Sequence, residues 1–352
     1  MLSLRDLNRT LLRRQHLLQR TRMPALAMVQ HLVGLQAQEN LPPYLSLAAR
    51  LEDFDPRELS RALEDRDAVR FLTMRGTIHV LVPEDALSLR GWVQRALDQQ
   101  SASNQMSRPA REVPVDALVT ATRRLLEAGP LPVKDLGERL AQIFPGVPAA
   151  ALAHTARERV PMVQLPPRGL WQQSGGVVYQ TVENWLGRQA AVPDVHELVR
   201  RYLRAFGPAT PADMTVWSRV TRLGPVFKEM AAELVVVECA DGIRRYDVPD
   251  APYAEADTPA PVRLLGAYDN VWLSHSNRDH IVPVEVRQRW MGTNGGVGNT
   301  IFVDGFMAGL WWYRDGRVVT DVFRQLTGAW KSDLDAEVDR VGVLLSSPPS
   351  HG

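Results

Sequence analysis

The stretch Val195-His-Glu-Leu-Val-Arg-Arg-Tyr-Leu-Arg-Ala-Phe-Gly-Pro-Ala-Thr-Pro-Ala-Asp-Met-Thr-Val-Trp217 decides the fold class. It predicts a helix that ends at Phe206, a turn that contains two prolines, and a second, short helix. Residues 223–233 predict a third helix, and residues 234–238 and 244–248 predict a β-hairpin. Three helices followed by a hairpin, in this order, are typical of a winged helix-turn-helix unit.

The same order is predicted twice before this unit, which we place at residues 193–257. In residues 1–110, helices are expected over 3–20 and 24–38, and a third follows the capping Asp55. Strand-forming residues then occupy 68–82.

Residues 111–192 repeat the pattern with three helices and two strands. We expect helices over 115–128, 131–140 and 148–159, and strands over 162–165 and 176–180. The chain therefore contains three tandem units of one kind, without obvious sequence identity between them.

The segment 258–352 differs in character. Asp304-Gly305 lies between two β-type runs, which is a good hairpin signal, and Arg314-Asp-Gly-Arg317 is a second turn of this kind. A last helix is expected over 333–345. The predicted fold is thus α+β and mainly α: three winged helices followed by a small antiparallel sheet or partial barrel.

Composition is ordinary for a globular protein. Of the 352 residues, 45% are hydrophobic and 23% are charged. We see no signal peptide and no run of apolar residues long enough to span a membrane. The single cysteine, Cys239, excludes an internal disulfide framework, and no zinc-ligand spacing occurs. We expect a cytoplasmic, nucleoid-associated protein without a metal or another cofactor.

Positive charge is carried almost entirely by arginine. The net charge is only +1, and just three of the 41 basic residues are lysines. Arginine binds phosphate through two parallel hydrogen bonds, although GC-rich codon usage explains the same bias. Six arginines precede residue 32 against one acid, Asp6, and they predict a local basic patch. They are Arg5, Arg9, Arg13, Arg14, Arg20 and Arg22.

Two glutamines in the segment 33–44 are the first candidates for chemistry. We expect a helix up to Gln38, broken by Pro42 and Pro43. Residues two apart on a helix point about 200° away from each other, so Gln36 and Gln38 converge only if the helix ends there. A solvated helical glutamine is the ordinary alternative.

The second candidate segment is Met74-Arg-Gly-Thr-Ile-His-Val80. On a strand, Arg75, Thr77 and His79 share one face, and such a face suits contact with phosphate. A half-exposed strand with a polar outer side explains the pattern equally well.

Other sequence patterns give weaker evidence for a functional site. The glycine-rich loop 292–298 lacks the lysine of a phosphate-binding loop, and Ser174 does not follow a strand that leads into a helix. His275 and His280 could bind a metal, but their spacing favours polar loop histidines.

Four motifs, in the same order along the chain, together resemble one family. They are Gly34-Leu-Gln-Ala-Gln38, Met74-Arg-Gly-Thr-Ile-His79, Leu264-Leu-Gly-Ala-Tyr-Asp-Asn-Val-Trp-Leu-Ser-His275 and Phe302-Val-Asp-Gly-Phe-Met-Ala-Gly309. The chain resembles the winged-helix DNA glycosylases of the AlkZ/YcaQ type over almost its whole length. The resemblance implies a concave DNA channel and monofunctional excision of N7-alkylguanine, including the unhooking of interstrand crosslinks. Gln-x-Gln is similar to the catalytic pair of the AlkZ branch, which is often tied to antibiotic self-resistance, and it implies Gln36 and Gln38 as the catalytic residues.

The chemistry agrees with this resemblance. Alkylation at N7 places a positive charge on guanine, so the base leaves neutral and needs no general acid. An amide oxygen can orient the attacking water, and positioning contributes up to roughly 7–11 kcal/mol. The expected partner is double-stranded DNA that carries alkylated guanine, bound by a monomer. Expected DNA contacts are Asn40, Arg75, Thr77, His79, His275 and Arg278.

A non-catalytic winged-helix transcriptional regulator is the alternative that the three units also permit. It predicts a symmetric dimer on a palindrome, whereas three different units in one chain suit a monomer that wraps a duplex. A small-molecule hydrolase would need a nucleophile and a base, and the sequence shows no such arrangement.

Overall fold

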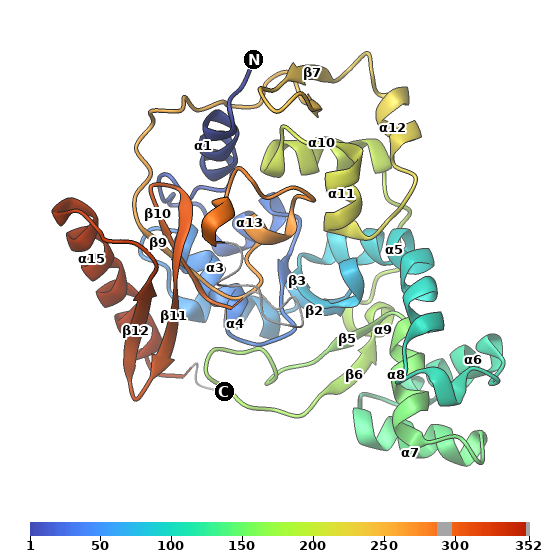
Figure 1. The fold of residues 1–352 in the computed structure, drawn as a ribbon. Coiled ribbons are helices and arrows are strands. Elements are labelled where there is room, and N and C mark those ends of the chain that lie inside the picture. The colour runs from blue at the N-terminus through green and yellow to red at the C-terminus, as the bar shows by residue number, and fades with distance from the viewer. Residues whose placement is uncertain (287–297, 350–352) are drawn as a thin grey trace.

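The computed structural model describes residues 1–286 and 298–349, which form an α+β fold (Figure 1). The first segment contains α1 (Leu4–Arg14), α2 (Ala25–His31), β1 (Leu35–Gln36), α3 (Pro42–Arg50), α4 (Pro56–Glu64), β2 (Val69–Leu72), the 3₁₀ turn η1 (Met74–Gly76), β3 (Ile78–Leu81), α5 (Pro83–Ser103) and η2 (Arg108–Ala110).

Two predicted helices of this segment are too long. Ser3 caps α1 with a reciprocal Ser3–Asp6 pair, as expected, but the helix ends at Arg14. The helix expected up to Gln38 ends at His31, because Val33 (φ 52°) and Gly34 (φ 97°) leave the helical region. The two prolines after Leu41 do not end a helix; they begin α3, where a missing N–H is tolerated.

The middle segment follows its prediction closely. It contains α6 (Val115–Glu127), β4 (Leu131–Pro132), α7 (Val133–Ile143), α8 (Ala149–Arg159), β5 (Met162–Gln164), β6 (Val178–Thr181) and α9 (Val182–Leu186). β5 pairs with β2 of the first segment, so both segments contribute to one six-stranded sheet of order β1-β3-β2-β5-β6-β4.

The third segment confirms the order helix, helix, helix and hairpin. It contains α10 (Val195–Phe206), α11 (Pro211–Ser218), α12 (Gly224–Glu229), β7 (Val235–Glu238) and β8 (Arg244–Asp247). Asp194 caps α10, and Thr210 with Asp213 forms a capping box at the start of α11. The N-terminus of the chain lies beside this hairpin, because Leu2 bridges to Cys239 (Figure 1).

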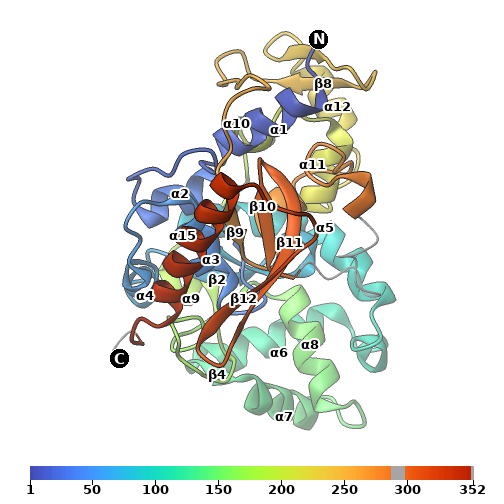
Figure 2. The ribbon, with the colours of Figure 1, turned by 60° about the vertical axis from the view of Figure 1, so that its left-hand side comes forward.

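The last segment forms the expected antiparallel sheet, in the order β12-β11-β10-β9. It contains β9 (Arg263–Leu265), α13 (Asn270–Leu273), η3 (Val284–Val286), β10 (Thr300–Val303), β11 (Phe306–Arg314), β12 (Arg317–Val322) and α15 (Gly328–Leu345). Asp304-Gly305 and Asp315-Gly316 make its two tight turns with positive φ angles. α15 covers β9 and β12 on one face (Figure 2).

Hydrophobic packing divides the chain differently from the succession of units. One core runs from Leu11 to Leu345 and joins residues of all four segments, including Val163, Leu165 and Trp171 of the middle segment. A second core lies in the middle segment and packs Leu118, Leu136 and Leu152 together. The division into four domains stays a prediction.

The arginine-rich N-terminus does not form the expected patch. Arg14 is fully buried in an ion pair with Asp247 (2.7 Å), and Arg9 is fully buried against Asp304. Arg5, Arg20 and Arg22 also pair with carboxylates, those of Asp304, Glu337 and Glu52. Five of the six side chains thus neutralise acids of this chain, and only Arg13 lacks an ion pair among the described residues. Within residues 1–286 and 298–349, no helix is both long and apolar enough to cross a membrane.

Candidate active site

Gln36 ends a short strand, and Gln38 lies in the bend that follows, so neither glutamine is at a helix end. After the left-handed bend at Gly34, β1 pairs antiparallel with β3, with Leu35 opposite Val80 and Gln36 opposite His79. The Ala37 N–H continues the pairing by donating to the Ile78 carbonyl at 2.7 Å. The predicted mechanism of convergence, a helix end, is therefore wrong.

The extended backbone at Leu35 and Gln36, continued by the Ala37 pairing, is expected to direct the two amides to one side. Side chains alternate along an extended chain, so the fully buried Ala37 points into the core and its neighbours point the other way. Gln36 is 7% exposed, whereas Gln38 is exposed to solvent. The Gln38 Oε1 accepts a hydrogen bond from the Ile78 N–H at 3.3 Å.

Arg75 lies at the tip of the β2–β3 hairpin, in the left-handed conformation (φ 56°). Its Nη2 donates to Gln36 Oε1 at 3.1 Å and to His79 Nε2 at 2.8 Å, and its Nη1 donates to the Trp217 carbonyl. Burial lowers the pKa of Arg75 to about 9, and Arg219 adds a smaller repulsion. The half-buried guanidinium is directed at protein acceptors, and its contact with phosphate stays a prediction.

His79 is fully buried and cannot contact DNA as expected. Arginine has no acceptor, so Nε2 must accept from Arg75 and the proton must sit on Nδ1. Nδ1 lies 3.0 Å from the Thr77 carbonyl and 3.2 Å from Thr73 Oγ1. Burial, and then the Arg75 charge, lower the pKa of His79 well below its usual value. The imidazole is therefore neutral at physiological pH.

Two of the other predicted contact residues lie near the glutamines. Thr77 is half-buried between η1 and β3, where its hydroxyl donates to the Met74 carbonyl at 3.2 Å. Asn40 follows Gln38 by two residues, and its buried Oδ1 has no hydrogen-bond partner among the described residues. For both Thr77 and Asn40, a contact with DNA stays a prediction.

His275 lies in the interior. It is 4% exposed, and its ring packs edge-on against His280 with centroids 4.7 Å apart. Burial lowers the pKa of His275, an effect that Asp213 partly offsets. The side chain joins α13 to the third segment, so the expected DNA contact is wrong for this residue. Arg278 is half-buried and donates to the Trp272 carbonyl at 2.7 Å.

A second support for β1 was not predicted. The buried Asn270 donates to the carbonyls of Gly34 (3.0 Å) and Leu32 (3.4 Å) and holds the bend before Gln36. The residue before it, Asp269, forms a fully buried ion pair with Arg50, with both N–O distances at 2.7 Å. Their separation of more than 200 positions along the chain left no local signal for this pairing.

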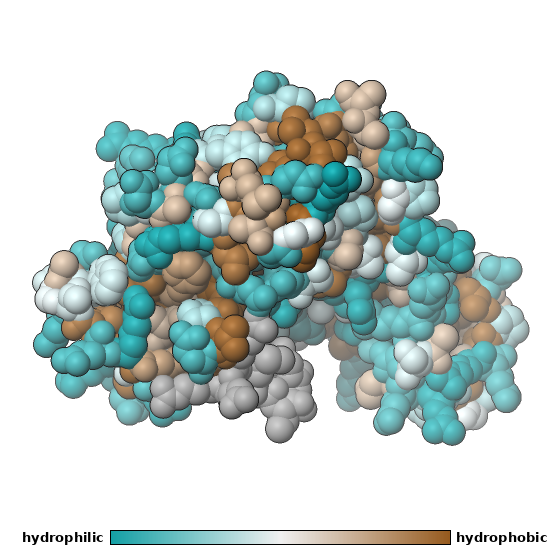
Figure 3. Space-filling model, turned by 45° about the horizontal axis from the view of Figure 1, so that its top comes forward, coloured by the Kyte–Doolittle hydropathy of each residue, from teal (hydrophilic) through white to brown (hydrophobic). Residues whose placement is uncertain are grey.

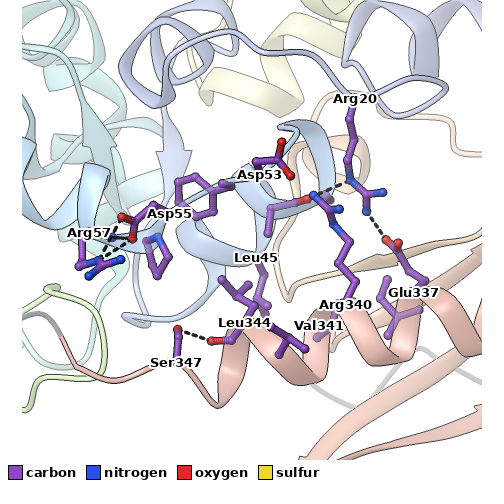
Figure 4. Close-up of a pocket in the computed structure, with 16 residues that line it drawn as sticks. Arg20, Leu45, Asp53, Asp55, Arg57, Glu337, Arg340, Val341, Leu344 and Ser347 are labelled. Atoms are coloured by element: carbon purple, nitrogen blue, oxygen red, sulfur yellow. Dashed lines mark hydrogen bonds and ion pairs between the residues drawn. The ribbon is translucent and has the colours of Figure 1, made fainter.

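The main cavities of the described residues lie away from the two glutamines. Four cavities of about 360 to 910 Å³ are lined by other residues, and neither glutamine borders any of them. The cavity of about 380 Å³ between α15 and the α3–α4 region is mainly apolar (Figure 4). Four of its six charged side chains are paired, Arg20 with Glu337 and Arg57 with Asp55, and the other two are Asp53 and Arg340. It holds no nucleophile beside a base, so the glutamine segment is the better candidate.

Neither of the predicted loop features adds a site. Within residues 1–286 and 298–349, no group of three or more His, Cys, Asp or Glu side chains could hold a metal ion. The glycine-rich loop at 292–298 lies outside the described residues, except for Gly298.

Comparison with known proteins decides the family. The family model described as DNA glycosylase AlkZ-like matches residues 29–343. The chain belongs to the AlkZ-like DNA glycosylase family. This confirms the resemblance of the four motifs, and nothing in the comparisons supports a transcriptional regulator.

A sequence comparison and a structural comparison show how far the likeness extends. The interstrand DNA cross-link repair glycosylase of Streptomyces sahachiroi is 26% identical over 336 residues, which cover 89% of this chain and 88% of the relative. The solved structure of S. sahachiroi DNA glycosylase AlkZ aligns with a TM-score of 0.79 at 23% identity. That alignment covers 98% of this chain and 97% of the solved one, so the fold is common to both.

Proposed function

We propose that this protein is a DNA glycosylase that hydrolyses the N-glycosidic bond of N7-alkylated guanine in double-stranded DNA. Family membership and the name of the S. sahachiroi relative support glycosylase action on crosslinked DNA. The observation that supports the proposal is that Gln36 at the end of β1 and Gln38 just after it each have the amide oxygen held by one protein donor.

The amides suit a reaction that needs positioning rather than proton transfer. A carbonyl oxygen has two lone pairs, so Gln36 and Gln38 each retain one acceptor site after bonding to Arg75 and Ile78. In the proposed step, these sites orient a water whose oxygen attacks C1′. The C1′–N9 bond breaks, its electron pair neutralises the cationic base, and the water proton passes to solvent. An undamaged guanine would leave as an anion, which two neutral amides cannot stabilise.

We propose that the substrates include interstrand crosslinks and bulky natural-product adducts. A crosslinked base is tethered to the opposite strand and cannot swing fully into a deep pocket. The exposure of Gln38, away from the four cavities above, is consistent with attack at an open surface. Figure 3 shows a recess between the lobe of α6–α8 and the rest of the molecule. We propose this recess as the DNA channel of a monomer, flanked by three winged helices.

We further propose that the enzyme is monofunctional. Cleavage of the abasic strand requires an amine that forms a Schiff base with the sugar. The three lysines, Lys134, Lys228 and Lys331, lie on α7, α12 and α15 rather than on β1, η1 or β3. Borohydride should therefore trap no covalent complex between the protein and DNA.

The test is single-turnover release of 7-methylguanine from duplex DNA. Wild type should release the base, and Gln36→Ala and Gln38→Ala should each slow release by about 10²-fold, the scale of a 1 Å misplacement. Gln30→Ala, an exposed glutamine on α2, is the matched control and should keep the wild-type rate. A duplex crosslinked through guanine N7 tests unhooking in parallel. Unchanged rates in both site variants would refute the assignment.

A further inference from the structure

We propose that Arg75 is a positioning residue that fixes the orientation of the Gln36 amide and acts on the reaction only through it. This inference rests on the proposed function of Gln36. It replaces the phosphate contact that the sequence predicted for Arg75.

The contacts of Arg75 favour positioning over DNA binding. The guanidinium meets three acceptors from three elements: Gln36 on β1, His79 on β3 and the carbonyl of Trp217 on α11. No carboxylate pairs with the half-buried Arg75 among the described residues, so neutral acceptors alone hold its guanidinium. Together, these partners fix the planar guanidinium in one orientation, in which one of its nitrogens points at Gln36 Oε1.

This contact distinguishes the two ends of the amide. The oxygen and nitrogen of a glutamine are similar in shape, so an amide without a partner can turn by 180° and exchange donor for acceptor. Arg75 can only donate, which holds the oxygen on its own side and places the remaining lone pair of Gln36 at a fixed point. A turned amide would present N–H groups where the attacking water needs an acceptor.

His79 completes the arrangement from the other side. It is fully buried and its Nε2 can only accept from Arg75, because Nδ1 holds the proton. A neutral imidazole is a fixed acceptor that keeps the guanidinium turned towards β1. The hairpin tip contributes as well, since Arg75 and Gly76 both have positive φ angles and bring the side chain back over β3.

The experiment is a double-mutant cycle on single-turnover release of 7-methylguanine, with DNA affinity measured on the same variants. Arg75→Met should reduce the rate by about 10²-fold and leave the Kd for undamaged duplex within about threefold, a change under about 1 kcal/mol. In the Gln36→Ala background, Arg75→Met should change the residual rate by less than about twofold, because the two side chains act as one unit. Arg75→Lys should resemble Arg75→Met, since an ammonium keeps the charge but lacks the fork.

Arg219→Met, an exposed neighbouring arginine that does not contact Gln36, is the matched control and should keep the rate. A second readout does not depend on activity. The side-chain amide resonances of Gln36, identified by their loss in Gln36→Ala, should shift and broaden in Arg75→Met and stay unchanged in Arg219→Met.

The outcomes separate this inference from the proposed function. If wild type releases no base, the proposed function fails and the role of Arg75 fails with it. If wild type is active and Gln36→Ala is slow, but Arg75→Met is additive with it or mainly weakens DNA binding, only the inference is overturned. Unchanged Gln36 resonances in a folded Arg75→Met protein would overturn it as well.

Discussion

Replacing Asp269 by asparagine should destabilise the protein by removing the charge that neutralises a buried arginine. Arg50 and Asp269 are both fully buried, and two hydrogen bonds of 2.7 Å join them. Asp269→Asn is nearly isosteric, keeps one oxygen as an acceptor and can still cap α13 through the Val271 N–H. The substitution therefore changes the charge and leaves packing almost untouched.

The magnitude follows from what Arg50 retains. Breaking a buried ion pair by removing one partner costs about 3–5 kcal/mol. Arg50 keeps one neutral acceptor or more at each Nη group, the Ser46 carbonyl and hydroxyl at Nη1 (3.0 and 2.9 Å) and Gln15 Oε1 at Nη2 (2.7 Å). The loss should thus lie near the lower end, at about 3 kcal/mol. Asp269→Leu also removes the cap and should cost roughly 1 kcal/mol more.

Urea unfolding followed by tryptophan fluorescence measures this difference, with the slope of the transition compared between variants. The matched control is Glu52→Gln, which breaks the exposed pair with Arg22, whose side chain is 85% exposed. That change should cost less than about 1 kcal/mol. A loss in Asp269→Asn no larger than that in Glu52→Gln would refute the reasoning, because burial would then add nothing to the value of the pair.

Two further predictions concern a histidine and a glycine. Burial, followed by the charges of His31 and Arg50, lowers the pKa of His16 to about 4 from 6.5. As the pH drops from 6.5 to 4, the unfolded chain protonates His16 before the folded protein does, so the free energy of unfolding should fall. His16→Asn should reduce this fall, measured as the urea midpoint against pH. An equal fall in wild type and variant would contradict the prediction. Gly34→Ala should cost about 1–3 kcal/mol, because φ is 97° and a Cβ would lie 2.4 Å from Leu81 Cδ2. In scanning fluorimetry, Gly91→Ala in the open α5 should instead stabilise by about 0.5–1 kcal/mol, and equal shifts in both variants would argue against a strained bend.

Sequence was most informative where local chemistry determines local structure. The helix Val195–Phe206 was predicted to the residue, since its apolar spacing, the Asp194 cap and the following Gly-Pro all agree. The Asp304-Gly305 turn was equally clear. Pro42 and Pro43 were misread as a break, although proline at the first helical position is as much a start signal as a stop signal.

Long-range pairing was beyond the sequence. The predicted helix was extended through Leu35 and Gln36, although Leu35-Gln-Ala-Gln38 alternates apolar and polar residues as a strand does. The strand that pairs with them, β3, lies more than 40 positions further along the chain. The N-terminal arginines carried no sign that Asp247 and Asp304 would neutralise them from more than 200 positions away. The sequence therefore indicated Gln36 and Gln38 as candidates, whereas the backbone that holds them and the contacts of Arg75 required the structure.

The pairing of β2 with β5 has a consequence for how the protein aggregates when it partly unfolds. The helices α6–α8 pack in a core of their own, whereas Val163, Leu165 and Trp171 of the same segment pack in the larger core. Cooperative opening of the middle segment therefore also withdraws these three side chains from the larger core. Opening would separate Arg70 from Gln164 and Phe71 from Val163, and would leave β2 as an unpaired edge. An exposed strand edge is a template for another chain. Partial unfolding of the middle segment should therefore appear as aggregation of molecules whose β1–β3 pairing is still intact.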